Sequence, residues 1–240
     1  ASEDDTVVAS GTTTGVEDGQ TVTVVFTDGS NATVTATTTV STNAWTLTGS
    51  EADISGLDNG TITITANVSD VAGNAASQAS KTITLDNVAP SAPSNAIDLA
   101  DGSDTGGSNS DNKTNDTTPT VRVDLTGTNA VAGDTLELLL GGASLSSAVT
   151  KTLDSTDISN TYVDLTTGAD LGSDGDKVFT AKVTDVAGNI GSAGGSLTVT
   201  LDTAAPTGLT IDGTLEVDNI VNASEDDTVV ASGTTTGVED

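Results

Sequence analysis

Three observations in the sequence predict an all-β protein. Apolar and polar residues alternate with period two in segments 61–68, 81–85, 120–125 and 196–201. Such alternation is typical of strands with one buried face. Turn-forming Gly, Asn and Asp separate these segments, as at 27–30 and 173–176. A helical period of 3.6 residues persists nowhere for three turns, so no long helix is expected.

The chain is strongly acidic along its whole length. Its 240 residues include 35 Asp and Glu against 6 Lys and Arg, a formal net charge of −29. This charge disfavours nucleic acid and anionic membrane surfaces as partners. Closely spaced carboxylates repel one another unless a cation neutralises them, and hard oxygen ligands favour calcium. A solvated acidic surface that only aids solubility is the alternative for carboxylates scattered on strands.

The composition also limits which metal sites and catalytic mechanisms are possible. Cys, His and Met are absent, which removes thiolate and imidazole metal sites, histidine acid–base catalysis and disulfides. We therefore expect no enzymatic activity, although hydrolysis by a pair of Asp residues stays open as an alternative. Hydrophobic residues make up 34% and aromatic residues 2%, which is also typical of disorder. The strand periodicity argues against disorder.

No export or membrane segment is evident in the sequence. No apolar stretch approaches the ~20 residues that span a bilayer. The first residues are acidic, unlike the basic start of a secretory signal. We therefore expect any export signal to lie outside this sequence.

The chain repeats its own beginning, because residues 223–240 are identical to residues 1–18. This repetition indicates a tandem array, whose usual roles are spacing and bridging. Asp-Val-Ala-Gly-Asn occurs at 70–74 and at 185–189, and each copy precedes a strand that closes in Leu-Asp-x-x-Ala-Pro. One period therefore contains two unlike domains, each about the size of a Greek-key immunoglobulin-like sandwich of ~100 residues and seven strands.

These motifs divide the chain into three parts. We predict a sandwich lacking its opening strand at 1–86, a complete sandwich at 87–202, and the opening strands of the next copy of the first domain at 203–240. The last part is expected either to stay disordered or to dock on the incomplete domain of a neighbouring molecule, by donor-strand complementation. Trp45, Phe26, Phe179 and Tyr162 lie in alternating segments and are expected to anchor the cores.

The densest acidic cluster, residues 98–119, follows the first domain boundary. It alternates Asp and Asn with Gly and Ser, so a loop of this composition can fold around a calcium ion with six to eight oxygen ligands. It is not an EF-hand, since no Glu stands at the twelfth position. A flexible linker is the alternative interpretation.

The chain resembles the bacterial immunoglobulin-like extender domains of giant RTX-type adhesins, which are secreted by the type I route. The resemblance lies in Leu-Ala-Asp-Gly-Ser-Asp-Thr-Gly through Asn-Asp-Thr-Thr-Pro at 99–119, Val-Thr-Asp-Val-Ala-Gly-Asn at 183–189 and Leu-Asp-Thr-Ala-Ala-Pro at 201–206. It covers 87–202 and the ends of the first domain, whose opening half departs from the pattern. In that family calcium at and near domain junctions holds the sandwiches in a stiff rod.

Carried over to this sequence, the resemblance implies calcium ligands at both junctions. At the first junction they are Asp86, Asp101, Asp104, Asp111 and Asp116, with Asp70 reaching across from the same end. At the second junction they are Asp185 and Asp202, with Asp212, Glu216 and Asp218 as weaker candidates. The loops that carry Asp70 and Asp185 have another interpretation, in which Asn74 and Asn189 only cap tight turns.

Together these features predict a non-catalytic, calcium-rigidified extender repeat of a large secreted bacterial surface adhesin. It would lie outside the cell and project a binding region for adhesion or biofilm formation. Its expected partners are neighbouring repeats of the same polypeptide. Two alternatives remain: a self-assembling filament or surface-layer subunit, and a module that binds carbohydrate or protein. The latter would need an exposed aromatic platform.

Overall fold

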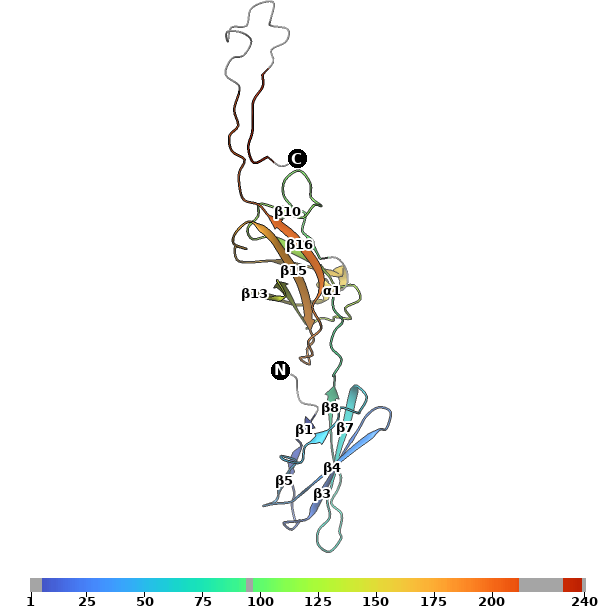
Figure 1. Cartoon of the computed structure of the whole chain (residues 1–240). Helices are drawn as coiled ribbons and strands as arrows, with labels where there is room; N and C mark the ends of the chain where they lie inside the picture. The colour runs from blue at the N-terminus through green and yellow to red at the C-terminus, as the bar shows by residue number, and fades with distance from the viewer. Residues whose placement is uncertain (1–5, 94–96, 212–230, 239–240) are drawn as a thin grey trace, which may run out of the picture.

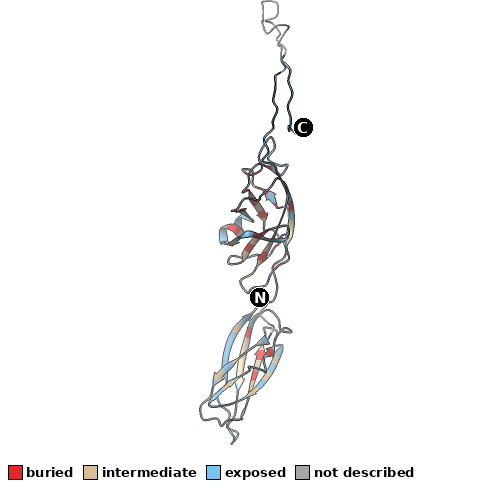
Figure 2. Cartoon of the chain, turned by 60° about the vertical axis from the view of Figure 1, so that its left-hand side comes forward, coloured by how far each residue is buried: buried red, intermediate tan, exposed pale blue. Residues whose placement is uncertain are grey.

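Two β-sandwiches follow one another along the chain, and a C-terminal segment projects beyond the second (Figure 1). This computed structural model describes residues 6–93, 97–211 and 231–238. Buried residues occupy the inside of each sandwich and exposed ones its outer faces (Figure 2). The predicted all-β class is confirmed.

The first sandwich has one continuous sheet and a second, fragmented layer. The sheet is antiparallel in the order β4 (Thr33–Thr39), β3 (Thr21–Thr27), β7 (Gly60–Asn67) and β8 (Ala79–Leu85). The opposite layer consists of two short pairs. In one pair β1 (Thr6–Val7) joins β6 (Ala52–Asp53), and in the other β2 (Ser10–Thr12) joins β5 (Ala44–Thr46).

Alternation in β3 builds the core of the first sandwich. Val22, Val24 and Phe26 point inward and are fully buried, while the intervening residues are half-buried on the other face. The expected core role of Phe26 is confirmed. Trp45 is only half-buried, with its ring against Gly11, where an added Cβ would lie 2.9 Å from the ring. Trp45 therefore covers one side of this core rather than filling it.

Asp28 holds the turn between β3 and β4. Its Oδ1 accepts hydrogen bonds from the backbone N–H of Ser30 and Ala32, and its Oδ2 accepts one from the N–H of Asp58. The hydrogen bond from the Asp58 backbone is the largest of the causes that lower the pKa of Asp28 below its ordinary value. The ionised carboxylate therefore ties this hairpin to the loop before β7.

We predict that Asp28 contributes to the acid sensitivity of the first sandwich. Because its pKa is lower when folded, its stabilisation is complete above the unfolded pKa of about 3.9 and is lost as pH falls through the folded value. Asp28→Asn should lower the melting temperature at pH 7 and flatten its decline below pH 4, as measured by thermal melts across pH. Asp58→Asn is the control, because it keeps the backbone N–H that donates to Asp28. If the melting temperature of Asp28→Asn fell below pH 4 as steeply as that of the wild type, the prediction would be contradicted.

The second sandwich has a five-stranded and a three-stranded sheet. The larger has the order β10 (Lys113–Thr114), β16 (Gly194–Leu201), β15 (Gly175–Thr184), β12 (Thr135–Leu140) and β13 (Ala143–Thr152). The smaller has the order β14 (Tyr162–Thr166), β11 (Thr120–Asp124) and β9 (Asp98–Leu99). Only the pairing of β10 with β16 is parallel among the described strands.

The core of the second sandwich is larger and uses residues from both sheets. Phe179 is fully buried among Leu, Val and Ile side chains, as predicted. Tyr162 is not a core residue: its ring lies on the outer face of β14, with the Arg122 guanidinium 4.2 Å from its centroid. Tyr162 begins its strand and is an outward residue in the alternation, so the prediction for it was wrong.

One short helix, α1 (Ser155–Asn160), joins β13 to β14. Asp154 caps it by accepting hydrogen bonds from the N–H groups of Thr156 and Asp157, and the Asp157 side chain accepts one from the N–H of Asp154. The helix is shorter than two turns, which explains why no helical period marks it in the sequence.

The linker between the sandwiches packs closely on the second one. An added Cβ on Gly191 would lie 2.5 Å from the Pro90 carbonyl oxygen, and one on Gly194 would lie 2.4 Å from that of Pro93. Both prolines are buried. Ser91 also donates its N–H to the Thr128 carbonyl at 2.9 Å. The missing side chains at these glycines therefore let the linker backbone lie directly on the sheet.

Candidate calcium-binding sites at the ends of the sandwiches

Strand pairing decides which acidic residues share an end of a sandwich. In the second sandwich β15 and β16 are antiparallel: Gly175 lies opposite Leu201, whereas Thr184 bridges Ile190. Asp185 and Asp202 therefore lie at opposite ends, separated by a ten-residue strand of about 30 Å. We call the end near the first sandwich the entrance end and the other the exit end.

The acidic loop, residues 100–119, lies at the exit end. The Ala100 N–H donates to the Thr120 carbonyl at 3.0 Å, and the Asp202 N–H donates to the Thr114 carbonyl at 2.9 Å. Asp86, by contrast, lies at the entrance end, where its carbonyl accepts a hydrogen bond from the Asn189 side chain. The predicted grouping of Asp101, Asp104, Asp111 and Asp116 with Asp86 is wrong; the structure brings these four to the end that holds Asp202.

Asp104 is the most buried acid of this loop, with 5% of its surface exposed. Its Oδ2 accepts a hydrogen bond from the Asn112 N–H at 3.2 Å. Its Oδ1 and the Oδ1 of Asn112 are both buried with no hydrogen-bond partner among the described residues. Leaving a buried acceptor unsatisfied costs about 1–3 kcal/mol, and more for a charged group. Two such oxygens in one loop are suited to a cation.

Several other side-chain oxygens of the loop already hydrogen-bond within it. Ser103 donates its hydroxyl to Asp116 Oδ2 at 3.0 Å and accepts the Thr120 N–H at 2.9 Å, and Asp116 Oδ1 accepts the Thr118 N–H. Asp101 and Asp111 are exposed. These bonds fix the loop, while Asp104 and Asn112 each keep a buried oxygen that has no hydrogen-bond partner among the described residues.

Asp174 adds a further acid at the exit end that the sequence analysis did not select. Its Oδ1 accepts hydrogen bonds from the N–H and the hydroxyl of Thr203, at 2.9 and 2.8 Å. Asp202 Oδ1 accepts the Ala204 N–H at 2.9 Å. Thr203 and Ala204, with which the chain leaves the second sandwich, are therefore held by hydrogen bonds to two carboxylates. Asp212, Glu216 and Asp218 lie outside the described residues.

The entrance end carries Asp185 beside the linker. Asp185 accepts the backbone and side-chain N–H groups of Asn189, each at 2.8 Å, and Asn189 also donates to the Asp86 carbonyl at 3.0 Å. This network joins the loop of the second sandwich to the residue that ends the first. Asp185 was predicted at the second junction, and the structure places it at the first.

Asp134 lies at the same end and was missed from the sequence. It precedes β12, and its neighbour Thr135 is paired with Thr184, next to Asp185. Only 2% of Asp134 is exposed; its Oδ2 accepts the Val131 N–H, and its Oδ1 is buried without a partner among the described residues. The signal in the sequence was a lone Gly-Asp turn before an apolar strand, which has no distinctive spacing.

Asp70 repeats the geometry of Asp185 in the first sandwich. It accepts the backbone and side-chain N–H groups of Asn74 at 2.8 Å each, and the Asn74 side chain is the largest cause that lowers the pKa of Asp70. Gly60 pairs with Leu85 and Ala66 with Ala79, so about 20 Å of strand separates Asp70 from Asp86. The prediction that they share an end is wrong. Asp70 lies in the loop that joins β7 to β8, whereas Asp86 follows the other end of β8.

These donor sets fit calcium in part. Calcium accepts carboxylate, amide and backbone carbonyl oxygens, and such oxygens surround Asp104 and Asp134. Within the described ranges, however, no three acidic side chains are grouped so that they hold a metal ion by themselves. A site at either end would therefore draw on Asn112 or on backbone carbonyls as well as carboxylates.

Part of the chain is similar to known bacterial domains. No curated protein matches it. A crystal structure of a tetra-tandem repeat in the extending region of a large adhesion protein is 27% identical, covering 98% of this chain and 53% of that one, with a TM-score of 0.34. A crystal structure of chicken CNTN1 FN1–FN3 domains is 10% identical, covering 77% and 57%, with a TM-score of 0.41.

The chain thus spans just over half the length of each of these two structures. Among the residues described here, no helix has the length and apolar character needed to cross a membrane. The family comparison covers the second sandwich with its linker and gives the firmest assignment. Residues 91–203 match the family model of the bacterial Ig-like domain.

Proposed function

We propose that this chain is an extender repeat of a secreted bacterial surface adhesin, a spacer without catalytic activity. The observation that carries the proposal is the junction between the sandwiches. Pro90 and Pro93 lie against Gly191 and Gly194, and Asn189 connects Asp185 to Asp86. A linker docked in this way limits bending between the domains. Repetition of residues 1–18 at 223–240 supports an array of such units.

We further propose that calcium stiffens the array. The unpartnered Oδ1 atoms of Asp134 at the entrance end and Asp104 at the exit end support this role. A cation that binds only the folded ends stabilises them by RT ln(1 + [Ca]/Kd), about 2.7 kcal/mol at one hundred times Kd. The net charge of −29 also favours cation binding over the whole chain.

Small-angle scattering of the full chain tests this proposal. In calcium we expect a rod-like profile with a fixed maximum dimension. With a chelator we expect a broader distribution of dimensions and a lower melting temperature, because the two ends lose a stabilising ligand. Magnesium at the same ionic strength is the control for screening. Equal profiles and equal melting curves with calcium and chelator would refute the proposal.

A second candidate function is head-to-tail assembly of separate copies into a filament. Residues 203–211 expose Leu209 and Ile211, and they precede a copy of the sequence that opens the first sandwich. Such a contact joins unlike surfaces and does not close on itself, so it would extend the rod without a covalent bond. A carbohydrate-binding role has less support, because Arg122 covers the ring of exposed Tyr162.

A further inference from the structure

One strand edge of the first sandwich takes part in none of the described pairings. β4 is the outermost strand of its sheet, where it pairs with β3 along its whole length. No described strand pairs with its other side. β5 lies in the opposite layer, and the Thr46 carbonyl there accepts the Thr38 hydroxyl at 2.7 Å. The main-chain edge of β4 is therefore free.

The place of β4 in the sheet order shows that this edge belongs to the sheet itself. β4 lies beside β3, which pairs with β7, just as β13 of the second sandwich lies beside β12, which pairs with β15. The opening segment of the second sandwich pairs with β11 and β16 and not with β13. β4 thus lies on the side of its sheet that is away from any opening strand.

The alternation along β4 decides which backbone groups the free edge offers. The Val40 N–H donates to the Gln20 carbonyl at 2.9 Å, and the Asp28 N–H donates to the Ala32 carbonyl at 3.1 Å. Even-numbered residues of this segment therefore bond toward β3. Because the direction of hydrogen bonding alternates along a strand, the odd-numbered residues point their N–H and C=O groups to the free edge. These residues are Thr33, Thr35, Thr37 and Thr39.

The segment that contains this edge is uncharged although the chain is strongly acidic. Residues 29–50 include no Asp, Glu, Lys or Arg, and they are the longest such stretch in the sequence. Every outward side chain of β4 is an exposed threonine. Asp28, the acid that precedes the stretch, is only 5% exposed, and its carboxylate accepts hydrogen bonds within its own turn. A second strand can therefore approach β4 without contacting a charged side chain of this segment.

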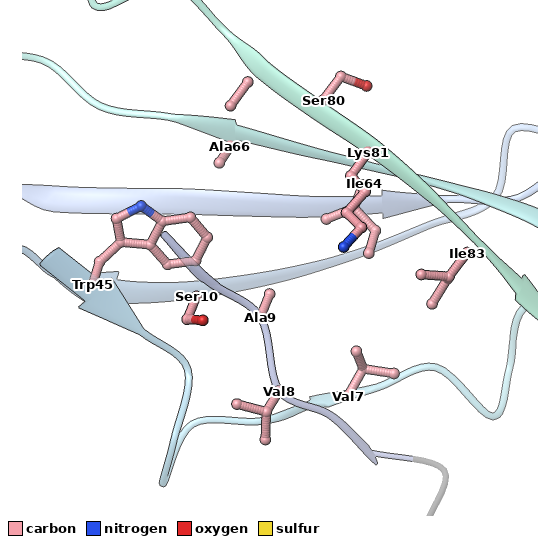
Figure 3. Close-up of a pocket in the computed structure, with 11 residues that line it drawn as sticks. Val7, Val8, Ala9, Ser10, Trp45, Ile64, Ala66, Ser80, Lys81 and Ile83 are labelled. Atoms are coloured by element: carbon pink, nitrogen blue, oxygen red, sulfur yellow. The ribbon is translucent and has the colours of Figure 1, made fainter. Parts of the chain in front are cut away.

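Two other outer strands carry features that oppose pairing, and β4 carries neither. On β13 the register with β12 is irregular, and Lys151 forms an ion pair with Asp157 of α1. On β8 Lys81 lies opposite Ile64, and both line the hollow that Figure 3 shows. Irregular register and lysine on an outer strand disfavour pairing with a further strand. The register of β4 with β3 is regular, and β4 has no charged residue and no proline.

The sequence of β4 is complementary to itself in antiparallel pairing. When a two-fold axis passes through Ala36, Thr33 lies opposite Thr39 of a second copy. Thr35 then lies opposite Thr37 of that copy. All four threonines point their backbone groups to the free edge, so this register gives every one of these N–H and C=O groups a partner. Thr–Thr pairs on adjacent strands also stabilise the pairing through their side chains.

We infer that the free edge of β4 is a site at which two copies of this chain join side by side. The two β4 strands pair antiparallel about Ala36, and the sheets of the two first sandwiches become one continuous sheet. The contact uses the same surface on both copies and therefore closes at a dimer. It lies on the flank of the sandwich, so it goes beyond the extender role and connects neighbouring arrays rather than lengthening one.

The net charge of the chain sets the conditions for this contact. Each copy carries a formal charge of −29, so two copies repel each other at low ionic strength. Salt screens this repulsion, while the backbone hydrogen bonds between uncharged strands depend little on salt. Association should therefore strengthen as salt is raised, and the experiment is done at moderate and high salt.

Sedimentation velocity of the full chain in calcium tests the site. We expect the weight-average mass to rise with protein concentration from that of a monomer to that of a dimer. The edge variant Thr35→Lys/Thr37→Lys should weaken association about tenfold or more, because lysines then lie directly opposite each other across the two-fold axis. Both positions are exposed, so the variant should keep its fold.

Two further variants make the test specific for this edge and this register. Thr82→Lys/Thr84→Lys makes the same change at exposed positions of β8, the outer strand at the other side of the same sheet, and it should leave association unchanged. Thr35→Glu/Thr37→Glu should associate as weakly as the edge variant by itself. An equal mixture of the glutamate and lysine variants of Thr35 and Thr37 should form a heterodimer, because opposite charges then face each other.

A cross-link at the axis gives an independent measurement. The chain has no cysteine, so Ala36→Cys introduces a single thiol. In the inferred register the two Ala36 residues form a non-hydrogen-bonded pair with Cα atoms about 4.5 Å apart, which a disulfide can span. Mild oxidation should therefore give a covalent dimer of Ala36→Cys. Thr82→Cys, at an exposed position of β8, is the control and should stay monomeric.

Several outcomes would overturn the inference. A chain that stays monomeric at every concentration and salt would exclude a second copy as the occupant, and β4 would be left to an extended segment of another protein. Equal weakening by the β8 variant, or oligomers that the edge variant leaves intact, would place the contact elsewhere. Failure of the mixed variants to associate would exclude the register about Ala36. None of these results touches the calcium dependence of the scattering profile, so the extender proposal fails or stands separately.

Discussion

Replacing Phe179 with Ala is expected to unfold the second sandwich while the first stays folded. Phe179 lies in the middle of β15, is fully buried, and is the largest side chain of its core. Truncation of a buried Phe to Ala costs about 3–5 kcal/mol, a large share of the 5–15 kcal/mol that usually stabilises a domain. The core that holds Phe26 shares no residue with it.

Differential scanning calorimetry of the full chain measures this effect. The wild type should show separable transitions for the two sandwiches, and Phe179→Ala should remove or strongly lower one of them. Val178→Ala is the matched control, because Val178 is the exposed neighbour in the same strand and should shift stability by no more than about 0.5 kcal/mol. A joint shift of both transitions would show that the sandwiches unfold as one unit and contradict the prediction.

Long strands were predictable from the sequence because each carries its own alternation. Segments 61–68 and 196–201 correspond closely to β7 and β16. The pairs β1–β6 and β2–β5 were not predictable, since strands of two or three residues are too short to show a period. They form because Val7, Ala9 and Leu47 pack on the core of the longer sheet. Tertiary packing, rather than local pattern, decides such elements.

The acidic candidates were predictable as residue types, but their grouping was not. Asp101 and Asp86 are close in sequence, yet they lie at opposite ends of the second sandwich. Asp185 and Asp86 are far apart in sequence, yet Asn189 connects them. Only strand order and direction decide which loops meet at one end. Asp134 was missed because a single buried acid in a turn resembles any other turn residue.

The second large effect is expected at Asp104. Its replacement by Asn should leave the stability of the second sandwich unchanged or higher without calcium, but lower than that of the wild type with calcium. Without calcium, Asp104→Asn removes a buried charge with an unpartnered oxygen, so the second sandwich should be as stable as the wild type or more so. At calcium one hundred times Kd the wild type should gain about 2.7 kcal/mol, or roughly 10 °C for a domain of this size. The variant should gain little, because it loses the charged ligand.

Thermal melts of wild type and variant, each in calcium and in chelator, measure this reversal of the stability difference. Asp111→Asn is the matched control: it lies in the same loop and removes the same charge, but Asp111 is exposed. It should keep most of the calcium gain. If Asp104→Asn kept the full gain, or if Asp111→Asn lost as much, calcium would be acting through general screening of the acidic surface. The proposed stiffening would then rest on the packed linker alone, without a bound ion at Asp104.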